Sequence, residues 1–197
     1  CDKVKGYSLT PNYKANFAIK NETSPEIIFA IPYDHKQGTV GNYLASMTYH
    51  YNQKYAFDPA GVYQWCGNGI CAQPGLYSSF EANDVRRNSL LIGQQYNAAT
   101  GAEVLMDNGE PLNYTEDIQN FTKAAQNEGA RLDKYEWSAT DSWERDNDWV
   151  LMRYAEVLMM QAEANYRLGY MQNALTYINQ IRKRAGLADL TSLDEDA

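Results

Sequence analysis

The chain has 197 residues, of which 44% are hydrophobic and 21% are charged. This balance is typical of a folded globular protein and excludes a disordered chain. The net charge is −8 and one tight basic cluster occurs, at residues 182–184, so the basic stripe that nucleic-acid binding requires is absent. No apolar run approaches the length of about 20 residues that a membrane-spanning helix needs.

Residues 1–32 predict a short helix followed by a buried strand. Thr10 is a suitable N-cap and Pro11 suits the first helical position, so a helix is expected from there to Phe17. Residues 26–31 form an apolar run that is rich in β-branched side chains and is closed by a proline. This run predicts a strand that is buried.

Residues 33–147 predict an irregular region. Its first part, to Gly75, has no clean periodicity and is dominated by Gly, Asn, Tyr and Trp. A stretch of this length without regular structure is usually functional or disordered, and the aromatic residues argue against disorder. Further along, a short helix is expected from Asp84 to Leu91, and Asn108-Gly109 predicts a hairpin turn among short strands.

Residues 148–187 predict a helix hairpin. Asp148 is expected to cap a helix over residues 149–168, in which apolar residues recur at helical spacing, and a second helix is expected over 171–185. Gly169 follows the first helix at the position where a positive φ is needed. Two helices joined by so short a turn must pack antiparallel. The turn resembles that of a tetratricopeptide repeat, a unit that needs neighbouring repeats to bury its faces.

The segment that contains Tyr51, Tyr55, Tyr63, Trp65 and Asn68 is the candidate ligand site. A sugar ring presents C–H groups on one face and hydroxyls around its edge. Flat aromatic rings suit the face, and amide side chains suit the hydroxyls. The alternative is that Tyr63 and Trp65 pack this loop against the helices. For the cluster as a whole, binding is the interpretation that we favour.

Cys66 and Cys71 flank a Gly-Asn-Gly-Ile spacer that can turn sharply, so a disulfide between them is predicted. The pair fits a disulfide better than a zinc site, because no second pair of ligands is present. Such a bond would hold Trp65 rigid and reduce the ordering cost of binding a ligand. No metal and no cofactor is expected.

No pattern of catalytic side chains is visible. Glu156 and Glu163 lie seven residues apart on one predicted helix, where two carboxylates border a solvated face more naturally than a scissile bond. The triplet Asp146-Asn147-Asp148 lacks the Gly and the distal Glu of a calcium loop. The sequence therefore predicts a protein that is not an enzyme.

The C-terminal helices carry a more specific pattern. Residues 149–164 and 178–187 resemble the signature of the SusD/RagB family. Shorter matches follow the order of the family along almost the whole chain, at residues 6–9, 26–29, 84–86 and 129–135.

This resemblance implies a mainly α fold, in which tetratricopeptide-like helix pairs form a superhelix with long irregular segments and a few short strands. It implies a non-catalytic lipoprotein that is lipid-anchored in the outer membrane of Bacteroidetes. Such a protein binds a glycan or a peptide at the cell surface and delivers it to a partner TonB-dependent transporter of the SusC type. The chain is then expected to be an internal segment, and Cys1 an interior residue rather than a lipid-bearing one.

Two other functions remain open from the sequence. A tetratricopeptide scaffold that binds another protein predicts further helix pairs and no ordered aromatic loop. A secreted glycan-active enzyme predicts two carboxylates that face one cleft.

Overall fold

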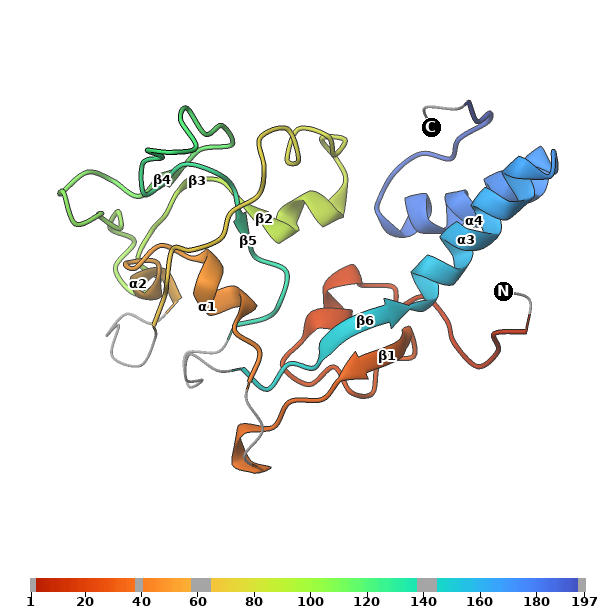
Figure 1. The fold of residues 1–197 in the computed structure, drawn as a ribbon, viewed down its shortest axis with the longest axis horizontal. Helices are drawn as coiled ribbons and strands as arrows, with labels where there is room; N and C mark the ends of the chain where they lie inside the picture. Colours follow the sequence, from red (N-terminus) through yellow and green to blue (C-terminus); the bar gives the residue numbers. More distant parts are fainter. Residues whose placement is uncertain (1–2, 38–40, 58–64, 138–144, 195–197) are drawn as a thin grey trace.

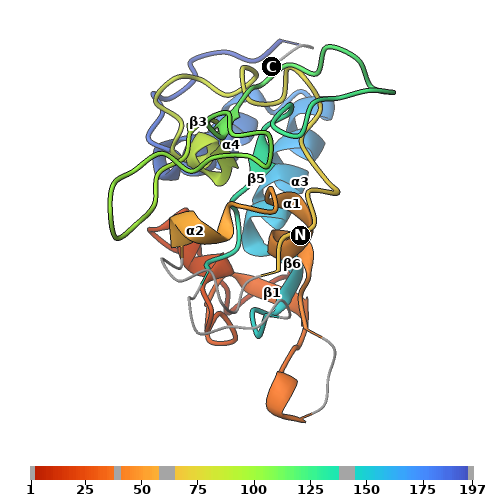
Figure 2. The ribbon, with the colours of Figure 1, turned by 90° about the vertical axis from the view of Figure 1, so that its left-hand side faces the viewer.

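The computed structural model describes residues 3–37, 41–57, 65–137 and 145–194. A helix hairpin lies at one end of the molecule, an irregular region lies at the other, and a pair of strands lies between them (Figure 1). Figure 2 shows the same molecule from the side of the irregular region, with the hairpin behind it. Within the described residues, no helix has both the length and the apolar character to cross a membrane.

Regular elements are short except at the C-terminal end, so the expected mainly α fold overstates the helical share of the described chain. The 3₁₀ helices are η1 (Tyr13–Phe17), η2 (His35–Gln37) and η3 (Val85–Ser89). The α-helices are α1 (Leu44–Thr48), α2 (Lys54–Phe57), α3 (Tyr154–Arg167) and α4 (Met171–Arg184). The strands are β1 (Ile27–Ile31), β2 (Leu90–Leu91), β3 (Gly93–Gln94), β4 (Asn113–Tyr114), β5 (Arg131–Leu132) and β6 (Trp149–Arg153).

Strand β6 corrects the prediction of a helix that begins at Trp149. It pairs antiparallel with β1, in a register that places Ile31 opposite Trp149. The carboxylate of Asp148 does not cap a helix, because it accepts a hydrogen bond from the backbone N–H of Tyr33. Helix α3 begins five residues later than predicted, at Tyr154. The apolar residues at the start of the predicted helix therefore belong to a strand.

Strand β1 is present where the sequence predicts it, but it is not buried. The side chain of Phe29 is 59% exposed and that of Ile31 is 42% exposed. The sheet has two strands in the described part of the chain. The apolar composition of this strand therefore does not reflect burial within the chain.

The helix hairpin and its turn are confirmed from residue 154 onward. Helices α3 and α4 pack against each other around a small core that includes Ala155, Leu158 and Ile181. Gly169 has a φ of +81°, and its N–H donates to the carbonyl of Tyr166. A residue with a side chain rarely adopts this left-handed conformation, so glycine ends the helix here.

The first helix begins later than predicted. Asn12, not Thr10, caps η1, and its side-chain oxygen accepts from the N–H of Lys14. The hydroxyl of Thr10 instead donates to a carboxylate oxygen of Glu26 at 2.9 Å. A cap accepts from a backbone N–H at the start of a helix, whereas Thr10 donates to the buried carboxylate of Glu26, so Thr10 belongs to that network and Asn12 is the cap.

The irregular region follows the sequence predictions at two points. Asp84 caps η3 by accepting from the N–H of Arg86, although the helix ends at residue 89 and β2 follows. The chain turns back at Gly109, whose φ is +84°, so that Leu112 donates to the carbonyl of Val104 at 2.7 Å. The predicted hairpin turn is therefore confirmed.

Candidate functional site

The loop over residues 65–70 is fixed against helix α1. The N–H of Gly67 donates to Ser46 at 2.7 Å, and the N–H of Gly69 donates to Met47 at 2.8 Å. Asn68 has a φ of +48°, and its N–H donates to Tyr49 at 2.8 Å. Asparagine tolerates the left-handed region better than most residues. An irregular loop thus has a defined backbone because it bonds along a helix.

The side chain of Asn68 forms hydrogen bonds within the protein, one to a backbone carbonyl and one to another side chain. Its amide nitrogen donates to the carbonyl of Gln126 at 2.9 Å, and its amide oxygen accepts from a guanidinium nitrogen of Arg131 at 2.8 Å. Arg131 also donates to the carbonyls of Glu128 and Gly129. Asn68 and Arg131 therefore join two loops, and the predicted role of Asn68 as a partner for ligand hydroxyls receives no support from this geometry.

Three of the predicted aromatic residues present part of a ring to the solvent. Tyr51 is 43% exposed, Tyr55 is 37% exposed and Trp65 is 51% exposed. The Trp65 ring lies over Gly67, where an added Cβ would come within 2.7 Å of a ring carbon. Tyr63 lies outside the described residues. We call Tyr51, Tyr55 and Trp65 the aromatic rim.

The buried His50 positions the start of this rim. Its Nδ1 accepts from the backbone N–H of Asn52 at 3.0 Å, and its Nε2 lies 3.0 Å from the side-chain oxygen of Gln126. Burial lowers the pKa of His50 below its usual range, which favours the neutral ring that this pattern needs. The His50 ring also lies 5.3 Å from the ring of Tyr51, centroid to centroid. Sequence reasoning did not identify this residue.

The predicted disulfide is not formed, and this corrects the sequence prediction. Both cysteines are free thiols. Cys66 is buried beside Tyr49, and burial raises the pKa of its thiol to about 11. The Cys71 sulfur lies against Gly129 instead, where an added Cβ would come within 2.5 Å of it. The intervening loop bonds along α1 rather than turning back on itself, so the two thiols face different neighbours.

A shallow hollow of about 230 Å³ lies beside Tyr55. Polar side chains at its edge are Asn97, Thr100 and Glu103. The hollow belongs to the hairpin that precedes Gly109, and the amide of Asn52 ties that hairpin to the rim by donating to the carbonyl of Leu105 at 2.8 Å. Amide, hydroxyl and carboxylate groups at the edge of a ring are suitable partners for sugar hydroxyls. No local pattern predicts these residues as part of the site, since they are far from the rim along the chain.

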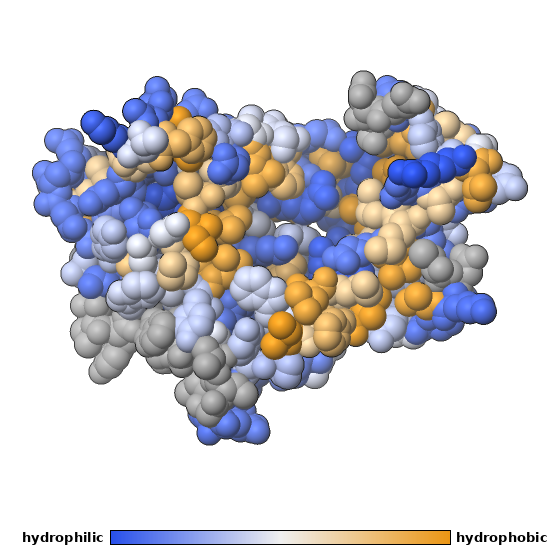
Figure 3. Space-filling view, viewed as in Figure 1, coloured by the Kyte–Doolittle hydropathy of each residue, from blue (hydrophilic) through white to orange (hydrophobic). Residues whose placement is uncertain are grey.

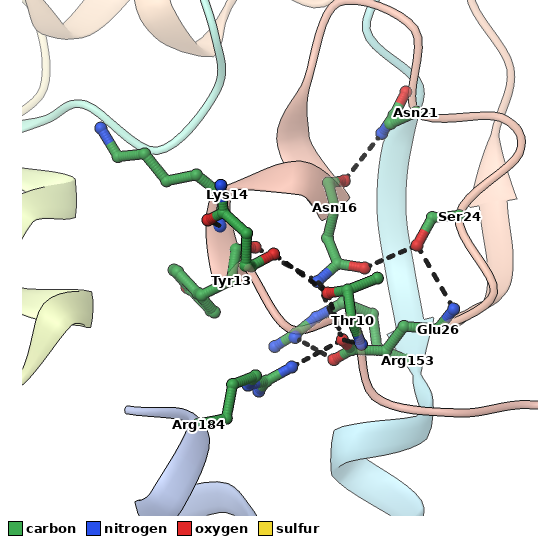
Figure 4. Close-up of polar contacts among 10 residues, drawn as sticks. Thr10, Tyr13, Lys14, Asn16, Asn21, Ser24, Glu26, Arg153 and Arg184 are labelled. Atoms are coloured by element: carbon green, nitrogen blue, oxygen red, sulfur yellow. Dashed lines mark hydrogen bonds and ion pairs between the residues drawn. The ribbon is translucent and has the colours of Figure 1, made fainter. Parts of the chain in front are cut away.

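A second cluster is centred on Glu26, which is fully buried (Figure 4). Its carboxylate accepts from Arg153 at 2.7 Å and from Arg184 at 2.6 Å. Thr10 and Asn16 donate to the same group. These contacts join four segments, so the cluster fixes the hairpin to the rest of the chain. The Glu26 cluster has a structural role, because all of these hydrogen bonds join groups of the protein itself.

Metal chemistry has no support in the described residues, where no group of three His, Cys, Asp or Glu side chains could hold an ion. Glu156 and Glu163, the carboxylates considered above, both line a groove along α3. Glu163 pairs with Arg167 on the surface of the helix.

Comparisons with known proteins identify the family. The model of the SusD family matches residues 25–197. Among solved structures, a surface glycan-binding protein A from Bacteroides uniformis is 20% identical with a TM-score of 0.65, and the match covers 99% of this chain and 38% of that chain. A SusD superfamily protein from Bacteroides fragilis is 19% identical with a TM-score of 0.66, covering 97% and 39%.

A third structure is surface glycan-binding protein A from Bacteroides thetaiotaomicron in complex with laminarihexaose. It is 24% identical with a TM-score of 0.62, and the match covers 98% of this chain and 42% of that chain. The chain thus spans about two fifths of the length of these structures. No curated protein sequence matches it. The family match covers most of the chain and the structural likeness covers nearly all of it, so the chain belongs to the SusD family.

Proposed function

We propose that the chain forms part of a non-catalytic protein that binds a glycan at the cell surface. The observation that carries the proposal is the aromatic rim, three partly exposed rings in a member of the SusD family, with Trp65 at the start of a loop that is bonded to α1. One structural relative is a surface glycan-binding protein in complex with laminarihexaose, which supports a glycan as the ligand class.

The partly exposed rings and the loop that supports Trp65 suit a sugar ligand. A ring that is half exposed can stack on the C–H face of a sugar and still keep its place in the fold. The bonds from the 65–70 loop to α1 order the loop before any ligand arrives, which lowers the entropy cost of binding. The hollow beside Tyr55 adds polar partners for hydroxyls. Flat apolar faces with polar edges are what a glycan requires.

In the same proposal, the protein is lipid-anchored in the outer membrane and delivers its ligand to a TonB-dependent transporter of the SusC type. Membership of the SusD family supports this part. Co-purification of the protein with such a transporter from outer membranes is the expected result. Recovery of the protein without any transporter, in detergent that preserves membrane complexes, would contradict it.

The test of the site is a binding measurement on matched variants. A glycan array and a peptide pool first supply the best ligand, with laminarihexaose included as a probe. Trp65→Ala is expected to weaken binding about tenfold, because stacking and apolar burial are both lost. Tyr55→Ala is expected to act in the same direction. Isothermal titration calorimetry measures both.

Tyr170→Ala is the control, since Tyr170 is also an exposed ring, at 59%, but lies in the turn of the helix hairpin. It should leave the affinity unchanged. Unchanged affinity in Trp65→Ala and in Tyr55→Ala would refute the site. A peptide that binds while all glycans fail would refute the ligand class.

A further inference from the structure

A second hollow, of about 350 Å³, lies between η1, β5 and the helix hairpin. Four cationic side chains line it: Arg86, Lys134, Arg153 and Arg184. Apolar side chains complete the wall, among them Leu76, Phe80 and Leu132. We call this hollow the cationic pocket. Figure 4 shows three of the lining residues, Tyr13, Arg153 and Arg184, each from a different segment.

Most of this positive charge is already paired. Arg153 and Arg184 share the carboxylate of Glu26, and Arg86 pairs with Asp84. Lys134 differs, because its ammonium forms no ion pair within the described residues and lies 4.4 Å from the centre of the Phe17 ring. Burial lowers the pKa of Lys134, and the charge of Arg153 lowers it further. A ligand anion gains the most binding free energy beside a half-buried cation that has no anionic partner.

Two buried polar atoms in the pocket wall also lack hydrogen-bond partners in the described structure. These are Nε of Arg184 and Oγ of Ser89. The side chain of Arg184 is 5% exposed, and Ser89 is 7% exposed. Buried polar groups are nearly always paired, so these two atoms are exceptions within the pocket wall. Both are buried behind the surface of the hollow, so a ligand anion would supply the missing acceptor only after the Arg184 or Ser89 side chain turns toward it.

We propose that the cationic pocket binds a carboxylate-bearing ligand of monosaccharide size, an acidic sugar, at a site separate from the aromatic rim. The carboxylate accepts from Lys134, and from Nε of Arg184 once that side chain turns toward the hollow, while the apolar wall takes the C–H face of the ring. The volume lies at the lower end of the range for small-molecule sites. The choice of a sugar as the body of the ligand rests on the function proposed above, whereas the choice of a carboxylate rests on this pocket alone.

Glu156 allows a test in which a substitution should tighten binding rather than weaken it. It is the carboxylate that lines the pocket, and its charge raises the pKa of Lys134. A bound carboxylate is therefore repelled by Glu156 and attracted by Lys134. Removal of the two charges must change the affinity in opposite directions.

The experiment measures the binding of sodium glucuronate and of glucose by calorimetry at low ionic strength. Glucuronate is expected to bind and glucose to bind at least tenfold more weakly. Lys134→Met should weaken glucuronate binding about tenfold and Ser89→Ala severalfold, while Glu156→Gln should tighten it severalfold. Lys123→Met removes a charge from an exposed lysine and should change nothing.

The outcomes separate this site from the aromatic rim. A gain of affinity in Glu156→Gln cannot come from misfolding, and Trp65→Ala should leave glucuronate binding intact. Absence of glucuronate binding overturns the proposal. So does equal binding of glucose, or an equal effect of Lys123→Met and Lys134→Met.

Discussion

The carboxylate of Glu26 receives hydrogen bonds from four side chains and one backbone N–H. Burial by itself would raise its pKa, but the bonds from Arg184, Thr10 and Asn16 outweigh that effect, so its pKa lies below the usual value. The charged form is therefore the one that the fold requires. Its partners come from segments up to 158 residues away.

Glu26→Gln is expected to destabilise the protein by about 3 kcal/mol, because it leaves Arg153 and Arg184 as buried cations without a counter-charge. Urea unfolding at pH 7 measures the loss. The matched control is Glu163→Gln, which breaks an ion pair with Arg167 whose side chains are 61% and 75% exposed. That change should cost less than about 0.5 kcal/mol. Similar losses in the two variants would contradict the structural role of Glu26.

The same carboxylate predicts a dependence of stability on pH. The folded protein holds the pKa of Glu26 below the value of 4.5 that is expected for an unfolded chain, so the unfolded state binds more protons between these two values. The stability from Glu26 is complete above pH 4.5 and is lost as the pH falls through the folded pKa. Below pH 4.5 the wild type should lose stability more steeply than Glu26→Gln. Parallel profiles in urea unfolding from pH 3 to 7 would count against this.

Residue types indicated accessible rings at Tyr51, Tyr55 and Trp65, but they predicted burial for the exposed strand β1 and did not show what the polar side chains contact. The aromatic rim follows from Tyr and Trp in a polar, glycine-rich segment. The hydrogen bonds of Asn68 to residues 126–131 and of Thr10 to Glu26 could not be predicted from the residue types. Local patterns indicated a ligand-binding role for Asn68 and a helix cap for Thr10. Long-range partners decide the role of a polar side chain, and a single sequence does not contain them.

At the scale of elements, the error at β6 has a defined cause. Residues 149–152 are Trp-Val-Leu-Met, and Leu151 continues the helical spacing of Ala155 and Leu158, so the predicted helix extended back to residue 149. The strand forms because β1, more than a hundred residues earlier, supplies a partner for its backbone. Tertiary pairing overrides the local pattern here. The hairpin turn at residues 168–170 was predictable because its geometry requires glycine locally.

Gly169→Ala tests that turn. Its φ of +81° is unfavourable for any residue with a Cβ, and no atom lies within 4 Å of an added Cβ, so the cost is one of backbone strain alone. A loss of about 1 kcal/mol in the free energy of unfolding is expected. Gly169→Asn should cost less, because Asn tolerates this conformation. An equal or larger loss in the Asn variant would show that side-chain size rather than φ is the constraint.

At the scale of the whole molecule, helix α2, which carries Tyr55 of the rim, and the helix hairpin lie at opposite ends (Figure 1). Apolar side chains gather over the strand pair and along the hairpin in the space-filling view (Figure 3). On α3, Met159 is 44% exposed and Met160 is 48% exposed, and both line a groove of about 560 Å³. A tetratricopeptide-like pair buries such a face against neighbouring repeats.

An uncovered apolar groove of this kind favours self-association of the 197-residue chain. The double change Met159→Ser and Met160→Ser is expected to reduce that association, because it removes apolar area from the face that would otherwise be covered. Sedimentation velocity over a concentration series measures it. Leu105→Ser is the control, since Leu105 is 47% exposed but lies on the hairpin beside the rim. Unchanged association in the double variant would show that the α3 face is not the contact, and so would an equal reduction by Leu105→Ser. The exposed groove would then need a different explanation from the stacking of helix pairs.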